Sequence, residues 1–402
     1  MKYEKSIQDF IVEYSGADTN QLRLKNIQAD FDVSWAILQI EARKKLRTKL
    51  PTWISHIDVV FPSILSTEQC SSELTAQYKQ RLIQGRDLLD LTGGLGVDSF
   101  YFAQKAGQVV YVERFGEYCR AAEHNFKELG NHNISVVQDD CTHFLKNNNH
   151  KFDTIYLDPA RRGTGNKRLF ALDECEPNII ELMPLLSRYG KRLVVKVSPM
   201  ADLSALIAQL PRVTEVHIVS VKNECKELLL VMDNTLPEKD KGIDTRAYCV
   251  QIDSAENISI FPFLPIEEKQ LPHPAACEAI EQFLYEPNAS ILKAGAYKTV
   301  AVKYSIDKLH INSHLYTSKY YISHFPGRIF EVVECVPFNA KNIKYIGGKY
   351  PRLNLSTRNF PLTTVELQKR LKNKDGGDFY LFGTTLSNND KILIIGKKPV
   401  NA

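Results

Sequence analysis

The spacing of hydrophobic positions changes near residue 87. Before that point, helical spacing places one apolar face on Val33, Ala36, Ile37 and Ile40. A second helix is expected over residues 67–84. The cations between Arg43 and Lys49 follow the first helix and are expected to form a solvated helix end. Residues 1–80 are therefore predicted to be a helical domain.

Beyond residue 87, short apolar runs alternate with helical stretches. The strands are expected at 88–91, 109–112, 134–137, 154–157, 192–197, 213–221 and 227–233. The helices are expected at 98–106, 117–129, 178–189 and 203–210. This alternation predicts an α/β domain over residues 81–235, with a parallel sheet covered on both faces. The last two strands have a short connection, which predicts an antiparallel hairpin at the sheet edge.

The remaining third of the chain changes character again. The polar, charged stretch 234–244 is typical of a linker. An α+β domain is predicted over 245–332, with a helix near 275–284. A break near 337–345 separates it from a last small α+β domain, 333–402, which ends in strands at 380–382 and 392–395.

Composition excludes several classes of protein. The chain has 402 residues, 44% hydrophobic and 24% charged, which argues against disorder and against a disulfide scaffold. No run of 18 apolar residues predicts a membrane span, and the first residues lack the apolar stretch of a signal peptide, so a cytoplasmic protein is expected. Eight cysteines without a C-x-x-C pair favour free thiols and no metal. Common metalloprotease, hydrolase and P-loop motifs are absent from the sequence.

A glycine-rich loop carries the strongest chemical signal. Asp90-Leu-Thr-Gly-Gly-Leu-Gly96 follows the first predicted sheet strand and opens a helix, so its backbone can approach a ligand closely. A dinucleotide fingerprint would need a glycine where this chain has Ser99. Glu113 ends the next strand and can accept hydrogen bonds from two ribose hydroxyls, and Asp140 ends the third, where it can hold an adenine amino group.

This ordered set resembles the class I S-adenosylmethionine-dependent methyltransferases over roughly residues 70–235. The resemblance implies a Rossmann-like sheet and S-adenosylmethionine as cofactor, with Asp158-Pro159 at the fourth strand end facing the methyl acceptor. The implied cofactor-binding residues are Asp90, Thr92, Gly93, Gly94, Gly96, Glu113, Arg114, Asp139, Asp140 and Cys141.

The flanking regions resemble bacterial methyltransferases that carry a ferredoxin-like segment and a THUMP-like C-terminal domain. The matching stretches include residues 68–79, Tyr285 to Gly295, Phe325-Pro-Gly-Arg328, Arg358 to Leu362 and residues 374–381. THUMP domains belong to RNA-modifying enzymes, so the resemblance implies an RNA partner, either rRNA or tRNA.

The identity of the acceptor depends on the fourth and fifth strand ends. Asp158, Pro159 and Arg161 are the catalytic candidates, because an acidic side chain and a prolyl carbonyl can hold an exocyclic amine and a guanidinium can stack on a base. Uridine C5 methylation needs a cysteine near the fifth strand end, where this chain has Lys196-Val-Ser-Pro199. A base nitrogen is thus favoured. The sequence leaves open whether Asp158 contacts the acceptor, binds the cofactor or caps a loop.

The net charge of +4 conceals a local asymmetry. Residues 341–375 hold nine Lys or Arg against Glu366 and Asp375, and tyrosines lie among them, as on a surface that follows a phosphate backbone. A merely solvated surface is the alternative. The candidate RNA-binding residues are Arg162, Lys349, Arg352, Arg358 and Lys374.

Two other functions compete with RNA methylation. One is methylation of a protein or small molecule, which predicts no salt-sensitive RNA affinity. The other is a non-catalytic RNA-binding protein built on the same fold. The retention of Asp90, the glycine loop and Glu113 argues against loss of cofactor binding.

Overall fold

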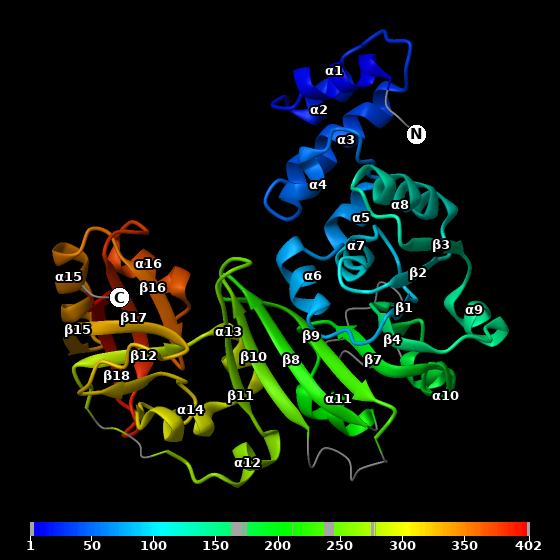
Figure 1. Ribbon diagram of the computed structural model, residues 1–402. Coiled ribbons are helices and arrows are strands. Elements are labelled where there is room, and N and C mark those ends of the chain that lie inside the picture. Colours follow the sequence, from blue (N-terminus) through cyan, green and yellow to red (C-terminus); the bar gives the residue numbers. More distant parts are fainter. Residues whose placement is uncertain are drawn as a thin grey trace. The chain divides into compact units, whose positions relative to one another are not determined.

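The computed structural model describes residues 4–161, 172, 175–210, 212–236, 245–274, 277 and 279–399 (Figure 1). The chain divides into two compact units. Unit 1 comprises Met1–Val221, Lys226–Thr245 and Ile252–Asn257, and unit 2 comprises Lys222–Cys225, Arg246–Gln251 and Ile258–Ala402. None of the helices within the described residues is long and apolar enough to cross a bilayer.

Unit 1 begins with helices, as predicted, but the second expected helix is two helices. The N-terminal helices are α1 (Lys5–Glu13), α2 (Thr19–Leu24), α3 (Val33–Leu46), α4 (Pro51–Ser55), α5 (Ile64–Gln69) and α6 (Glu73–Gln80). Residues 67–84 were expected to be one helix, which is wrong. Ser72 starts α6 as its N-cap, with Oγ accepting from the Thr75 N–H at 3.2 Å, so the chain breaks between α5 and α6.

The N-terminal helices share hydrophobic cores with the α/β part of unit 1. Phe10, Ile11 and Leu22 pack with residues of α3 and with Ala121 of α8 (Gly116–Glu128). Trp53 lies edge-on to Phe100 of α7 (Val97–Ala103), with ring centroids 5.6 Å apart. The first 80 residues and the sheet belong to the same compact unit. A separate N-terminal domain that ends at residue 80 stays a prediction.

The sheet of unit 1 confirms the predicted fold class. Its strands are β1 (Asp87–Asp90), β2 (Gln108–Glu113), β3 (Ile134–Gln138), β4 (Phe152–Leu157), β7 (Gly190–Val197), β8 (Val213–Val221) and β9 (Glu224–Asp233). Their order is β8-β9-β7-β4-β1-β2-β3. Strands β1 to β4 and β7 pair in parallel, whereas β9 pairs antiparallel with β7. The β8–β9 hairpin therefore lies at the β7 end of the sheet, with β9 inserted next to β7.

Helices connect the parallel strands and cover the sheet (Figure 1). Besides α7 and α8 they are α9 (Cys141–Asn147), α10 (Ile179–Tyr189) and α11 (Leu203–Gln209), and a short ribbon joins β5 (Ala160–Arg161) to β6 (Cys175–Glu176). The parallel register aligns Asp90 with both Tyr111 and Tyr156. Because parallel strands present their carboxyl ends at one edge, this register gathers the predicted motif residues there.

Unit 2 contains a seven-stranded sheet of order β13-β14-β12-β15-β18-β17-β16. These strands are β12 (Phe283–Pro287), β13 (Asp307–Lys308), β14 (Tyr316–Ser318), β15 (Gly327–Pro337), β16 (Asn354–Arg358), β17 (Phe379–Thr385) and β18 (Lys391–Lys397). Its helices are α12 (Pro265–Gln270), α13 (Ala289–Ala294), α14 (Tyr297–Tyr304), α15 (Ala340–Lys349) and α16 (Thr364–Leu371). It also holds β11 (Ile258–Phe263) and most of β10 (Arg246–Ile252).

Two sequence predictions for the chain beyond residue 233 are wrong, and a third falls mostly on residues that the structure does not describe. The helix near 275–284 is absent from the described part of that stretch: residues 279–282 are irregular, and β12 starts at Phe283 because it pairs with β14 and β15 on both sides. The break near 337–345 is replaced by α15, which Asn339 caps by accepting from the Asn342 N–H at 2.9 Å. Most of the predicted linker, residues 237–244, lies outside the described residues.

Candidate active site

A cavity of about 450 Å³ lies in unit 1 at the carboxyl ends of β1, β2 and β4. Its lining brings together every residue predicted to bind the cofactor, and also Asp158. The lining residues among them are Asp90, Thr92, Gly93, Gly94, Gly96, Glu113, Arg114, Asp139, Asp140, Cys141 and Asp158. Asp90 and Asp158, 68 positions apart in sequence, thus meet in one place, as the strand-end argument requires.

The glycines of the loop are required by close packing. A Cβ on Gly93 would lie 2.2 Å from the Tyr111 ring, and one on Gly96, which has a φ of +87°, would lie 2.7 Å from the Phe126 ring. The Tyr111 hydroxyl donates to the Gly94 carbonyl at 2.5 Å, which fixes the loop over β2. The loop therefore packs directly against β2 and α8 at Gly93 and Gly96, where no side chain would fit.

Asp90 is a buried carboxylate at the end of β1, with 1% of its surface exposed. Its oxygens accept from the Ser99 hydroxyl at 2.6 Å and from the Thr92 N–H at 3.1 Å. Burial raises the pKa of Asp90 to about 7, although both hydrogen bonds oppose the shift and the nearby carboxylates of Asp98 and Asp158 add to it. A cationic ligand group would offset the free-energy cost of ionising the buried Asp90, because it would pair with the charged carboxylate.

Glu113 and Asp140 are held in place by backbone amides. Glu113 accepts from the Gly94 N–H and the Phe115 N–H, both at 2.9 Å. Asp140 caps α9 by accepting from the N–H groups of Thr142 and His143, at 2.8 and 3.2 Å. Both carboxylates are therefore fixed before any ligand binds, which lowers the ordering cost of binding.

The other predicted cofactor residues around Asp140 are oriented by ion pairs and burial. Asp139 binds the ring of His143 at 2.8 Å, and Arg114 pairs with Glu176. Burial raises the pKa of the Cys141 thiol, with the Asp140 charge adding to it, so the thiol stays protonated. Within the described residues, no group of three or more potential ligand side chains is arranged to hold a metal.

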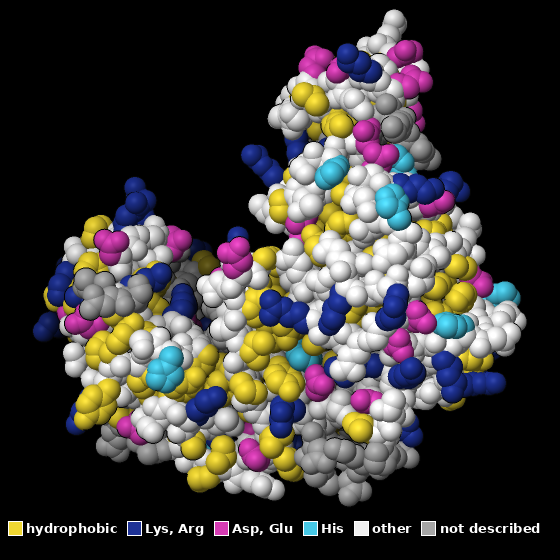
Figure 2. All heavy atoms as spheres, viewed as in Figure 1, with side chains coloured by type: hydrophobic (Ala, Val, Ile, Leu, Met, Phe, Trp, Pro, Cys, Tyr) yellow, Lys and Arg dark blue, Asp and Glu magenta, His cyan; other side chains and the backbone are white. Residues whose placement is uncertain are grey.

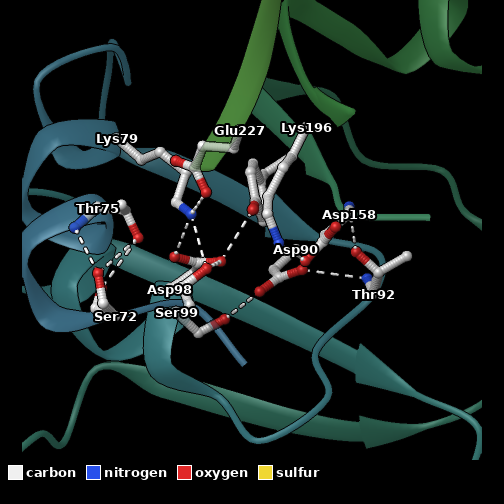
Figure 3. Close-up of polar contacts among 12 residues, drawn as sticks. Ser72, Thr75, Lys79, Asp90, Thr92, Asp98, Ser99, Asp158, Lys196 and Glu227 are labelled. Carbon is white, nitrogen blue, oxygen red and sulfur yellow. Dashed lines mark hydrogen bonds and ion pairs between the residues drawn. The ribbon is translucent and has the colours of Figure 1, made fainter. Parts of the chain in front are cut away.

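Asp158 faces the cavity from the end of β4 and is held from two sides. Its N–H donates to the Thr92 hydroxyl at 2.6 Å, and its Oδ2 pairs with the ammonium of Lys196 (Figure 3). Pro159 is buried beside it. Arg161 contributes backbone to β5, but its side chain and all of Arg162 lie outside the described residues.

A buried charge cluster next to the cavity was not predicted from the sequence. The ammonium of Lys79, which is fully buried, lies 3.0 Å from both Asp98 Oδ1 and Glu227 Oε2 and donates to the Ser71 hydroxyl at 2.7 Å (Figure 3). Ser71 and Asp98 line the cavity. The cluster joins α6, α7 and β9, so only its contacts across long sequence separations identify it. The position of Asp98, directly after the glycine loop, was the one available signal.

The pKa shifts in this cluster follow from burial and pairing. Burial acts to raise the pKa of Asp98, but the cations of Lys79 and Lys196 outweigh it, and the net pKa is lowered. Burial raises the pKa of Glu227 despite the same two cations. Burial acts to lower the pKa of Lys196, yet the surrounding carboxylates, Asp158 first, raise it. Lys196 is therefore a permanent cation and not a base.

The predicted RNA-binding residues of unit 2 differ in whether a carboxylate already pairs with them. Lys349 is bound to Glu334 at 3.0 Å and to the Tyr345 hydroxyl at 2.7 Å, and Arg358 is bound to the buried Glu286 at 3.1 Å. Arg352 and Lys374 are exposed neighbours, joined by a backbone bridge. Two of the four described candidates thus already have carboxylate partners.

Comparisons with known proteins agree with this architecture. A family model of a ferredoxin-like domain matches residues 283–326, and a THUMP domain-like model matches residues 327–398. An "uncharacterized RNA methyltransferase" of Thermotoga maritima is 31% identical over 148 residues, covering 36% of this chain and 30% of that protein. Ribosomal RNA large subunit methyltransferase K/L of Colwellia psychrerythraea is 36% identical over 90 residues, covering 21% of this chain and 12% of that protein. The chain thus spans less than a third of the length of either relative.

One solved structure matches the whole chain. It is the crystal structure of a "putative methyltransferase" from Porphyromonas gingivalis W83, with 35% sequence identity and a TM-score of 0.88. The alignment covers 99% of this chain and 100% of that one. The chain belongs to the same family, that of class I methyltransferases in which the methyltransferase fold is followed by ferredoxin-like and THUMP-like domains.

Proposed function

We propose that the protein is an S-adenosylmethionine-dependent methyltransferase that transfers a methyl group to a base nitrogen of rRNA or tRNA. The observation that carries this proposal is the unit 1 cavity, whose lining unites the predicted cofactor residues with Asp158. Its volume of about 450 Å³ falls in the range of small-molecule and cofactor sites.

The residues present fit the cofactor. Asp90 offers a buried anion to its ammonium group, and Glu113 offers two preoriented oxygens to its ribose hydroxyls. Gly93 and Gly96 let the loop that lines the cavity pack against Tyr111 and Phe126, where no Cβ fits. When bound, the cofactor supplies an activated methylsulfonium. The protein then needs mainly to align the acceptor and exclude water.

An amine acceptor suits the chemistry around Asp158. A carboxylate accepts N–H bonds from an exocyclic amine and stabilises the positive charge that methyl transfer places on its nitrogen. The fifth strand supplies Lys196, not a cysteine, next to Asp158. The cavity-lining thiol of Cys141 has a raised pKa. These groups offer no activated nucleophile of the kind that carbon methylation of uridine requires.

RNA as the substrate class is supported by unit 2 and by the names of relatives. The THUMP domain-like match covers residues 327–398, which include the basic stretch 341–375. On the face drawn in Figure 2, Lys and Arg side chains lie among acidic and apolar ones, without forming a single continuous basic stripe. We therefore expect RNA contacts from individual cations, Arg352 and Lys374 first. An enzyme acting on rRNA or tRNA would work in the cytoplasm.

The test is methyl transfer from tritium-labelled S-adenosylmethionine to total RNA, protein and metabolite extracts of the host. Label in RNA supports the proposal, whereas label only in protein or metabolites contradicts the RNA assignment. RNA binding without transfer would favour a non-catalytic RNA-binding protein. Asp90→Ala should abolish cofactor binding, and Asp158→Ala should keep binding and lose turnover.

A further inference from the structure

Carboxyl groups outnumber cations around Lys196. Lys196 and Lys79 are the cations of a cluster whose carboxylates are Asp90, Asp98, Asp158 and Glu227. Figure 3 shows these side chains converging from α6, α7 and the strands β1, β4, β7 and β9. Lys196 thus has more than one carboxylate available as a partner.

Glu227 has one oxygen with nothing to bind. Its Oε2 pairs with Lys79 at 3.0 Å, while its Oε1 is buried without a hydrogen-bond partner among the described residues. A buried carboxylate oxygen left unpaired is costly and would be stabilised by a second cation.

Lys196 is placed to supply that cation. In the antiparallel β7–β9 pair Lys196 lies opposite Leu229, so Glu227, two residues earlier, is its diagonal neighbour on the same face of the sheet. Diagonal neighbours are about 7–8 Å apart at their Cα atoms, within reach of long side chains. The flexible four-carbon stem of lysine allows its ammonium to change partners without movement of the strand.

A static Lys196 would oppose the proposed reaction. Methyl transfer to an amine breaks the bond from carbon to sulfur, whose electron pair stays on the sulfur, and forms a bond to nitrogen with the nitrogen lone pair. Positive charge therefore moves onto the acceptor nitrogen, which afterwards releases one N–H proton to solvent. A lysine ammonium fixed on Asp158 would repel that charge. It would also weaken the electrostatic stabilisation that the Asp158 carboxylate gives to the acceptor.

We propose that Lys196 is an exchangeable positioning residue: its ammonium holds Asp158 while the acceptor is absent and shifts to Oε1 of Glu227 when the acceptor amine takes Asp158. This inference rests on the proposed function, in which Asp158 faces the acceptor. Lys196 keeps its proton throughout, and Glu227 exchanges an unpaired oxygen for an ion pair. The exchange keeps Asp158 oriented in the free enzyme and free of a competing cation during transfer.

The decisive variant is Glu227→Gln, which removes the charge of the alternative partner and keeps the side-chain shape. We expect the acceptor KM to rise about tenfold, the scale of one charge-assisted hydrogen bond, with cofactor affinity unchanged. Tyr156→Phe is the matched control: it removes a 2.8 Å hydrogen bond to Asp98 in the same cluster but leaves both partners of Lys196 intact. It should lower stability to a similar degree and leave the acceptor KM unchanged.

Variants of Lys196 should change kcat and not the acceptor KM, the opposite of Glu227→Gln. Lys196→Met removes both the competitor for Asp158 and the group that orients it, so kcat should fall while the acceptor KM does not rise. Lys196→Arg should restore part of kcat, because it keeps the charge. A folded Glu227→Gln enzyme with the kcat and acceptor KM of the unaltered enzyme would overturn the exchange.

A readout without turnover separates this inference from the proposed function. The side-chain ammonium resonance of Lys196, assigned with Lys196→Arg in protein labelled with ¹⁵N at lysine Nζ, should respond to Asp158→Asn in the free protein. With sinefungin, a cofactor analogue carrying an amine in place of the methylsulfonium, it should respond to Glu227→Gln instead. A resonance that stays sensitive only to Asp158 contradicts the exchange. Absence of label in RNA with the unaltered enzyme contradicts the proposed function alone.

Discussion

Gly93 and Tyr111 are packed so closely that a Cβ on Gly93 would lie 2.2 Å from the Tyr111 ring. Tyr111 is fully buried in β2 and cannot move away, because its hydroxyl also holds the Gly94 carbonyl at 2.5 Å. The glycine loop is therefore positioned by an aromatic side chain of the neighbouring strand.

Gly93→Ala should displace the loop and abolish cofactor binding. Overpacking of this kind typically costs about 1–3 kcal/mol of folding free energy, so the protein should still fold. Isothermal titration with S-adenosylmethionine measures the loss, and thermal unfolding measures the stability. Gly16→Ala is the control, because nothing lies within 4 Å of a Cβ there. Normal cofactor affinity in Gly93→Ala would contradict this role of the loop.

Cofactor affinity should depend on pH through Asp90. Its pKa is raised to about 7 by burial, so near neutral pH part of the free protein carries a neutral Asp90 that cannot pair with an ammonium group. Affinity should fall by up to about tenfold per pH unit below 7, with uptake of the cofactor releasing a proton. Titration calorimetry in buffers of different ionisation enthalpy detects that proton. Asp90→Asn should remove the dependence together with most of the affinity.

The same shift predicts how stability of the ligand-free protein changes with pH. An Asp whose folded pKa lies above its unfolded value binds more protons when folded, so its contribution to stability is lost as pH rises from about 4 to about 7. Asp90→Asn should therefore unfold at a higher temperature than the unaltered protein at pH 8, by about 3 °C or more, and show a smaller gain at pH 5. An equal difference at both pH values would contradict the assignment to Asp90.

Lys79→Met should be among the most destabilising single changes in unit 1. It leaves Asp98 and Glu227 as buried charges without their 3.0 Å partner, which typically costs about 3–5 kcal/mol. Denaturant unfolding measures the free energy. Lys127→Met, which removes an exposed pair with Glu123 at 2.9 Å, is the control and should change stability by about 0.5 kcal/mol or less.

Arg43 corrects the expectation of a solvated helix end. Its guanidinium donates to the carbonyls of Ile54, Ile57 and Val59, at 3.1, 2.6 and 2.8 Å, and so joins α3 to α4 and to the chain that follows α4. Arg43→Gln should lower the free energy of unfolding by about 2 kcal/mol, because these three backbone carbonyls lose a charged hydrogen-bond donor. Lys45→Gln, which changes a half-exposed side chain paired with Glu68, should have little effect on the unfolding free energy.

RNA affinity should respond unequally to the basic residues of unit 2. Removing Arg352 or Lys374, which are exposed, should each reduce the slope of log affinity against log salt by about 1. Lys349→Gln should reduce it less, because Lys349 is already paired with Glu334. Fluorescence anisotropy with host tRNA and rRNA fragments measures the slopes. Equal slopes for all three variants would mean that unit 2 does not contact the phosphates through these residues.

The sequence by itself determined the α/β fold and the set of motif residues that line the unit 1 cavity. Asp90, Glu113 and Asp140 follow strands, and parallel strands must end at one edge of the sheet, so local pattern was enough to bring them together. It did not determine the role of Arg43 or Lys79. Both look like surface cations of a helix in sequence, and their partners lie 8 to 148 residues away.

Only the tertiary structure decided which charges are buried together. Burial costs a charge its hydration, so a partner must be supplied from wherever the fold brings one, and sequence separation carries no information about that choice. The pairing of Lys196 with Asp158 arises from the register of β4 and β7, and the position of Glu227, with its unpaired oxygen, diagonal to Lys196 arises from the register of β7 and β9. Local sequence thus determines the glycine loop, while strand pairing determines which charged groups meet around Asp158.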